Sequence, residues 1–181
     1  MTTRSVLKYA ILYLGYDDKI NLDDPNVTEE TVPELKTLLR CANLTYQELF
    51  SDYFPAFKSE KITFTNGFIP YCELEERLID IYGLYNNGNV KYVADALGIH
   101  ADVSDAEITY SYVLPELKLD SIVQIDGRLT GKLFALGICA EYCIINNLFD
   151  ESINFERRYK EGLKSLLRKK TDIMVKPRRW F

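Results

Sequence analysis

The stretch LTGKLFALGICAEYCIINNLF, residues 129–149, decides how we expect this chain to fold. Apolar residues occupy nearly every side of a helix drawn over it, which is typical of a central helix packed against several neighbours. Glu141, Asn146 and Asn147 interrupt the apolar run, so the run is shorter than the roughly 20 apolar residues that cross a bilayer. The stretch therefore predicts the core helix of a soluble domain.

Two helices are predicted before this one. Residues 3–15 carry apolar side chains at helical spacing, and Gly15 is placed to end the helix in a left-handed cap. Residues 32–53 follow a capping box formed by Thr31 and Glu34, and the apolar stripe continues until Pro55 ends the helix.

A fourth helix is predicted over residues 151–170. Asp150 is its expected N-cap, and Glu156 and Lys160 form an i,i+4 pair of opposite charge. After residue 170 comes a short tail in which Pro177 is incompatible with helix. We expect residues 171–181 to be an extended C-terminal arm.

The period of the apolar residues changes to two in the middle of the chain. Residues 62–64 alternate up to a turn at Asn66-Gly67, residues 78–85 are expected to form a hairpin with residues 90–94, and a last strand runs from Ile108 to Leu114. The predicted fold class is α+β. It is a helical bundle of two N-terminal and two C-terminal helices, one domain over residues 1–170, with a small antiparallel β-sheet subdomain inserted at residues 60–114.

Charge is unevenly distributed along the chain. Residues 151–181 hold ten Lys and Arg against four Asp and Glu, a net charge of +6, whereas residues 1–150 carry −11. Such asymmetry is typical of a tail that meets an oppositely charged partner, either nucleic acid or an acidic protein surface.

Motifs for catalysis or for ligands are weak. Gly127 to Leu133 resembles a phosphate-binding loop, but it has three residues between its glycines instead of four, and Leu133 replaces the hydroxyl that would bind magnesium. Cys139 and Cys143 are one helical turn apart, and a closed metal site would also need Cys41 or Cys72 and the single histidine, His100, which we place in a polar loop. We expect no cofactor, no metal and no catalytic site.

Two features suggest contacts with other chains. The tail places cations beside large aromatic side chains, the residue types that anchor interfaces; the candidate contact residues are Lys176, Arg178, Arg179, Trp180 and Phe181. Glu141 lies within the apolar helix, so it should either reach a cation such as a nearby arginine or face a subunit contact. Arg157 and Arg158 are the further candidates for that contact.

The segment Ala140 to Glu151, then Phe155 to Lys160, then Arg178-Arg179-Trp180 resembles small structural proteins of tailed phages, the head-to-tail connector (adaptor) proteins that include the tail tubular protein A group. The order of helices, inserted sheet, helices and arm is similar along the whole chain. The resemblance implies a non-enzymatic virion subunit that is made in the host cytoplasm and placed in the neck of the particle.

The resemblance also implies the partners. Connector proteins form rings, commonly dodecameric, that join the capsid portal to the tail and conduct the genome without reading its sequence. The arm would contact the portal protein, a tail or further connector protein would lie on the other side, and no membrane would be involved. An alternative is a nucleic-acid-binding accessory protein that uses the basic residues 157–170 and the tail. An enzyme with a hidden Cys-His pair is a more distant alternative.

Overall fold

The computed structural model describes residues 1–24, 26–124 and 128–167, and within them the fold is α+β, with four α-helices and two small antiparallel sheets. The chain forms two compact units. The described residues of 1–45 and 117–167 make a helical unit, and Tyr46–Glu116 make a β unit. The predicted insertion, residues 60–114, is thus part of a somewhat longer compact segment. The predicted arm lies outside the described residues.

The helices have the following bounds: α1 Thr3–Tyr13, α2 Pro33–Glu48, a π-helical continuation η1 Leu49–Tyr53, α3 Gly131–Ile145 and α4 Phe149–Leu167. The end of α1 agrees with its sequence. Gly15 has a φ of 69°, Tyr16 N donates to Ile11 O at 3.0 Å, and Gly15 N donates to Leu12 O at 3.2 Å. This is the pattern of a Schellman cap, which a residue with positive φ makes possible.

The predicted start of α2 is wrong in its detail. The helix begins at Pro33, and Lys36 N donates to Val32 O, so the residue before the proline occupies the cap position. The Thr31 hydroxyl accepts a hydrogen bond from Thr28 N at 2.9 Å instead of capping the helix. A tight turn before the helix uses this side chain, and Pro33 suits the first helical position because its missing N–H would have no helical partner there.

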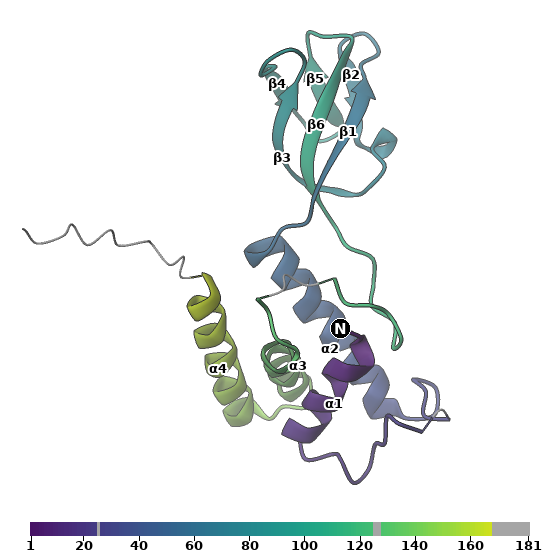
Figure 1. Cartoon of the computed structure of the whole chain (residues 1–181), viewed down its shortest axis with the longest axis vertical. Coiled ribbons are helices and arrows are strands. Elements are labelled where there is room, and N and C mark those ends of the chain that lie inside the picture. The colour runs from purple at the N-terminus through teal and green to yellow at the C-terminus, as the bar shows by residue number, and fades with distance from the viewer. Residues whose placement is uncertain (25, 125–127, 168–181) are drawn as a thin grey trace, which may run out of the picture. The chain divides into compact units, whose positions relative to one another are not determined.

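Helix α3 is the central helix of its unit, as predicted. Nine of its residues are buried, from Phe134 to Cys143. It packs against α1 and α4, between which it lies in Figure 1. The helix also passes close to α2, because a Cβ added to Gly137 would lie 2.5 Å from Thr45 Cγ2 on that helix. The same Cβ would lie 3.1 Å from the Tyr159 ring on α4.

The predicted boundary between the last two helices is also wrong. Helix α3 ends at Ile145, not at residue 149, and α4 begins at Phe149, so Asp150 lies inside the first turn of α4 and is not its cap. Asn147 has a φ of 59°, and Leu148 N donates to Cys143 O at 2.8 Å. Asparagine tolerates this left-handed conformation better than most residues, so α3 ends at Ile145, four residues before the apolar run stops at Phe149.

A side-chain clamp joins the two chain segments that flank the β unit. Asn43 Oδ1 accepts from Leu117 N at 2.6 Å, and Asn43 Nδ2 donates to Leu117 O at 3.0 Å. Both residues belong to the helical unit. The chain therefore leaves this unit and returns to it at one place, which lets a complete β unit be inserted without separating the helices.

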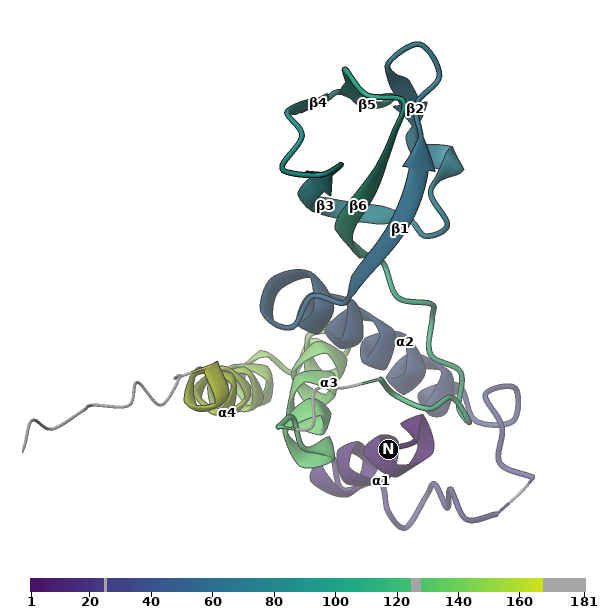
Figure 2. The ribbon, with the colours of Figure 1, turned by 45° about the horizontal axis from the view of Figure 1, so that its top comes forward.

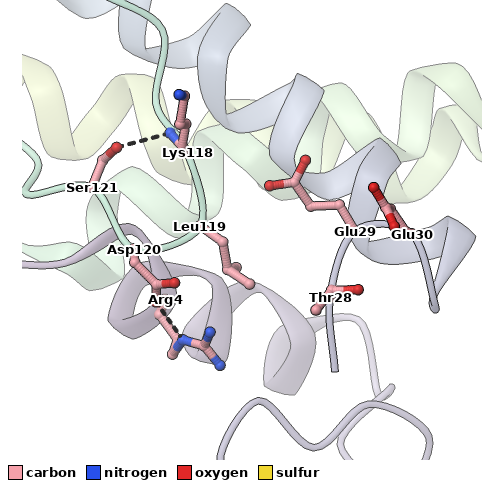
Figure 3. Close-up of a pocket in the computed structure, with 8 residues that line it drawn as sticks. All are labelled: Arg4, Thr28, Glu29, Glu30, Lys118, Leu119, Asp120 and Ser121. Carbon is pink, nitrogen blue, oxygen red and sulfur yellow. Dashed lines mark hydrogen bonds and ion pairs between the residues drawn. The ribbon is translucent and has the colours of Figure 1, made fainter. Parts of the chain in front are cut away.

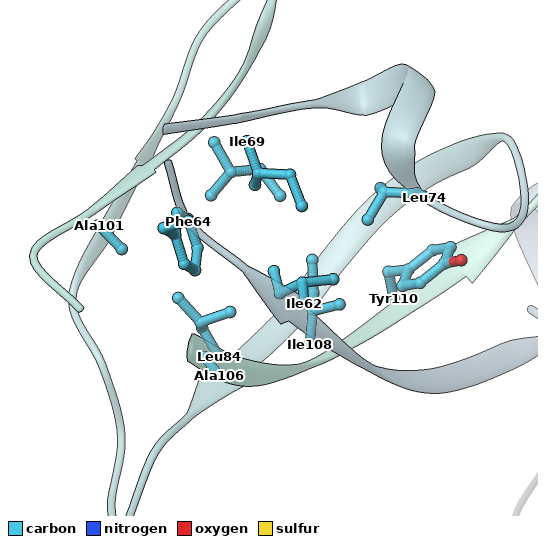
Figure 4. Packing of buried hydrophobic residues seen from close by; sticks show 10 residues of the cluster. Ile62, Phe64, Ile69, Leu74, Leu84, Ala101, Ala106, Ile108 and Tyr110 are labelled. Carbon is cyan, nitrogen blue, oxygen red and sulfur yellow. The ribbon is translucent and has the colours of Figure 1, made fainter. Parts of the chain in front are cut away.

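The β unit contains six strands: β1 Phe57–Thr63, β2 Phe68–Pro70, β3 Leu78–Tyr85, β4 Tyr92–Ala94, β5 Gly98–Ala101 and β6 Asp105–Tyr112. They form two antiparallel sheets with the orders β1-β6-β3 and β2-β5-β4. Figure 2 shows β6 between β1 and β3. Side chains from both sheets share one apolar cluster, in which Ile62, Ile69 and Ile108 lie close together (Figure 4).

The sequence predicted the turn at Asn66-Gly67 correctly but paired the wrong strands. Both turn residues have positive φ, 54° and 76°, as a two-residue hairpin turn of the primed kind requires. However, β3 pairs with β6, and β4 pairs with β5; only an isolated bridge joins Tyr85 to Asn89. Strand β5 was not predicted, and His100, which was expected in a loop, lies on it.

Candidate assembly surface

The predicted contact residues lie in different parts of the chain. The five tail residues, Lys176, Arg178, Arg179, Trp180 and Phe181, are outside the described residues. Glu141 is on α3, and Arg157 and Arg158 are on α4. Of the predicted contact surface, the structure therefore describes only the part on the α3–α4 hairpin.

Five large apolar side chains are exposed around the turn of this hairpin, and we call them the apolar band: Ile144, Ile145, Leu148, Phe149 and Ile153. The most exposed are Phe149 at 58% and Ile153 at 62%. The turn itself is well held, because Ser152 Oγ donates to Ala140 O at 3.2 Å in the buried space between the helices. Apolar side chains gathered on a rigid turn are typical of surfaces that bind other proteins.

Charged side chains lie beyond the apolar band on both helices. Glu141 precedes Ile145 by four residues on α3 and is half-buried, and Arg157 follows Ile153 by four residues on α4 and is exposed. Residues four apart share one face of a helix. The band is thus bordered by a carboxylate on one helix and a guanidinium on the other, the apolar centre and polar rim of an interface.

The three charged residues that were predicted to contact another subunit, Glu141, Arg157 and Arg158, differ in the neighbours that they contact. Among the described residues, no ion pair joins Glu141 to a cation, and partial exposure lowers the cost of its charge. Arg157 donates to Asn154 Oδ1 at 3.3 Å. The Arg158 guanidinium lies 5.9 Å from the centre of the Tyr13 ring on α1, so it packs on its own unit. Arg157 is the better candidate for a contact with another chain.

Helix α4 is not basic as far as it is described. Residues 149–167 contain four acidic and four basic side chains, and Glu156 pairs with Lys160 at 2.5 Å, as predicted. Asp150 and Glu151 in the first turn and Lys164 in the last turn complement the helix dipole. The excess of positive charge therefore belongs to residues 168–181.

Three thiols lie buried in the helical unit: Cys41, Cys139 and Cys143. Burial raises the pKa of Cys41 to about 12 and raises the pKa of Cys139 and Cys143 as well, so all three are neutral at physiological pH. Cys139 Sγ points to Ala10 O at 3.6 Å. These thiols fill the core as small apolar groups. The described residues include no cluster of three or more metal-ligating side chains.

The loop that resembles a phosphate site enters α3. The Thr130 side chain accepts from Leu133 N and caps the helix, and Lys132 Nζ lies 5.8 Å from the centre of the Tyr9 ring. Gly127 is outside the described residues. Thr130 and Lys132 thus have structural contacts at this end of the helix.

His100 is held by neighbours within the β unit. Its Nε2 is 2.9 Å from Asp95 Oδ2, and its ring packs on Phe68 with centroids 4.7 Å apart. Backbone N–H groups of Leu97 and Gly98, together with His100, hold the pKa of Asp95 below its usual value. The pair thus fixes the loop before β5. The free Cys72 is exposed in the same unit.

The helical unit has a cleft of about 690 Å³ that is lined mostly by polar residues (Figure 3). Arg4 pairs with Asp120 at 2.9 Å on one side, and Glu29 and Glu30 stand on the other. Arg4 also donates to Leu22 O at 2.7 Å. The ion pair joins the returning segment 117–123 to α1, and the bond to Leu22 joins α1 to the loop that follows it, so Arg4 and Asp120 have structural roles.

Two wider findings bear on the class of protein. Searched over its described residues, the chain has no helix that combines the length and the apolar character of a membrane span. The chain matches no model of a known protein family and no sequence among the curated proteins.

Proposed function

We propose that this protein is a structural virion subunit of a tailed phage, a head-to-tail connector that forms a ring, of twelve copies by the family's pattern, between portal and tail. The apolar band carries the proposal. Phe149 and Ile153 expose much of their side chains beside a turn that a buried hydrogen bond from Ser152 to Ala140 holds, and self-association would cover this surface. The charged residues at the border of the apolar band, Glu141 and Arg157, suit a repeated contact between copies.

Charge distribution supports a role around DNA without tight binding to it. The β unit has twelve acidic and four basic residues, a net charge of −8. A ring with such surfaces repels the phosphate backbone, so a genome would pass through without adhering. The basic tail, which contains Lys176, Arg178 and Arg179, remains for a contact with the portal protein.

A nucleic-acid-binding accessory protein is the second candidate. It would need the cations of residues 157–170 on one exposed face, but α4 is balanced in charge as far as it is described. Affinity for duplex DNA at low salt separates the two functions. The connector should bind weakly, and tight binding with a steep salt dependence would favour the accessory protein.

The connector function is tested by co-assembly with the portal protein of the same genome. The full chain should sediment with portal rings, and a chain that ends at Thr171 should not. Equal binding by both chains would refute a docking role for the tail.

Ring formation is tested separately by electron microscopy and light scattering. Ile153→Asp should reduce the fraction of rings at least about tenfold, because a carboxylate in an apolar contact must be desolvated. Leu12→Asp is the matched control, since Leu12 is a similarly exposed apolar residue on α1. Rings that form equally well with both variants would exclude the apolar band as the subunit contact.

A further inference from the structure

The β unit has an apolar hollow of about 230 Å³ that its own side chains leave open, and we call it the β-unit hollow. Its walls come from the end of α2 with η1, from the start of β3 and from the segment that follows β6. The lining residues are Gln47, Phe50, Ser51, Ile79, Tyr112, Val113 and Leu114. All of them belong to the β unit.

The chemistry of the β-unit hollow favours a large apolar side chain. Among its lining residues, Phe50 and Leu114 are buried and Ile79 is 40% exposed. The volume is below the roughly 300–1,000 Å³ of typical small-molecule sites. One aromatic side chain from another protein segment is therefore a better fit than a cofactor.

Carboxylates adjoin the lining residues in the chain. Asp52 follows Ser51, Asp80 follows Ile79, and Glu116 lies two residues after Leu114. All three are exposed, and no ion pair between described residues engages them. An occupant that carries cations next to its aromatic side chain would be attracted to this place.

We propose that the β-unit hollow binds the tail Lys176–Phe181 of a second copy of this chain. The tail has the required chemistry, since Arg178 and Arg179 directly precede Trp180 and Phe181. The charges of the two units agree with this pairing. The helical unit with its tail is +3 and the β unit is −8, so copies attract one another in a head-to-tail sense. Contacts of this heterologous kind produce rings when they close.

This contact does not depend on the connector function. The same six residues cannot occupy the β-unit hollow and contact a portal protein at once, so portal binding would release the tail. A variant altered in the β-unit hollow should therefore still bind the portal, which makes failure of this inference distinguishable from failure of the proposed function.

The fluorescence of Trp180 tests the inference, because this is the single tryptophan in the chain. In the full-length protein, emission should lie at short wavelength at high concentration and shift to longer wavelength on dilution. Ile79→Lys should weaken this concentration-dependent binding on the order of 30-fold, as the loss of an interface anchor does. The introduced ammonium also repels the arginines of the tail.

Val93→Lys is the matched control, because Val93 is an exposed apolar residue of the same unit and the charge change is the same. It should leave the emission of Trp180 as in the unaltered protein. Circular dichroism should show that both variants are folded.

Three outcomes would overturn the inference. Emission of a solvent-exposed indole at every concentration would mean that the tail is not bound. A short-wavelength emission that Ile79→Lys does not change would place the indole elsewhere. Emission that responds to Ile79→Lys but not to dilution would assign the tail to its own chain and exclude the second copy.

Discussion

The two units of this chain form their hydrophobic cores in different ways. The helical unit is assembled from both ends of the chain around α3, whose residues are buried on nearly every side. The β unit is one continuous segment with a net charge of −8 and a core shared by two short sheets. The helical unit thus has its apolar core along one central helix, whereas the β unit has a small shared core and many acidic side chains.

The largest expected effect is a difference in the reactivity of the cysteines, because the thiol of the β unit is exposed and those of the helical unit are buried. Cys72 of the β unit should react at once with a thiol reagent near pH 8, whereas Cys41, Cys139 and Cys143 should react only after the helical unit opens. For a stability of about 5 kcal/mol or more, reaction through opening is slower by a factor on the order of 10³ or more. Counting modified thiols against time by mass spectrometry measures this.

Cys72→Ser provides the control for the thiol experiment. It should remove the fast phase and leave three slow thiols. If all four thiols react at similar rates in the unaltered protein, the helical unit is not the well-packed body that the burial of α3 indicates.

A smaller effect is expected from Gly137→Val on α3. The new side chain would collide with Thr45 and with the Tyr159 ring, both of them buried, so the free energy of unfolding should fall by about 3 kcal/mol. Gly15→Ala should cost only about 1 kcal/mol, because that position has a positive φ but open space around it. Urea denaturation gives both values.

Hydrogen exchange shows whether the damage stays in one unit. Gly137→Val should lower the protection of amides in α3 and α4, while amides of β6 keep theirs. An equal loss of protection in β6 would mean that the two units open together, and the comparison between them would then describe packing but not stability.

The contrast between local and distant interactions explains which parts of the fold were predictable. The Gly15 cap and the Asn66-Gly67 turn depend on the backbone freedom of single residues, so their types indicate them directly. The partners of β3 and β4 depend on β6 and β5, which lie far along the chain. The clamp between Asn43 and Leu117 joins residues 74 positions apart, and no local sequence pattern predicts it.

Prediction of the candidate site from the sequence was limited in the same way, because its exposure depends on interactions between distant residues. Four residues of the apolar band, from Ile144 to Phe149, were predicted as parts of a core helix, because their exposure depends on where α3 ends. That end is set by Asn147 in a left-handed conformation. Ile153 was not singled out in the sequence. The β-unit hollow was not seen at all, since its walls come from three separate segments.

The smallest expected effect is that of Tyr110→Phe in the β unit. The hydroxyl of this buried side chain donates to Glu60 Oε1 at 2.9 Å and accepts from Glu76 N at 3.3 Å. Its removal leaves both groups without this partner, and since water can reach the outer part of the network, the cost should be about 1 kcal/mol at pH 7. Urea denaturation again measures the difference.

Alkaline pH should reduce that difference. Burial, and then the hydrogen bond to Glu60, raise the pKa of Tyr110 from 10.0 to about 12. Because the folded pKa is the higher one, the stabilising contribution of the neutral phenol is complete below pH 10 and is lost as the pH rises toward 12. Tyr110→Phe removes this dependence, so the two proteins should become more similar in stability between pH 10 and about 12. A difference that stays constant over this range would show that the phenol ionises as easily in the folded β unit as in the unfolded chain, against the burial and the hydrogen bonds that hold it.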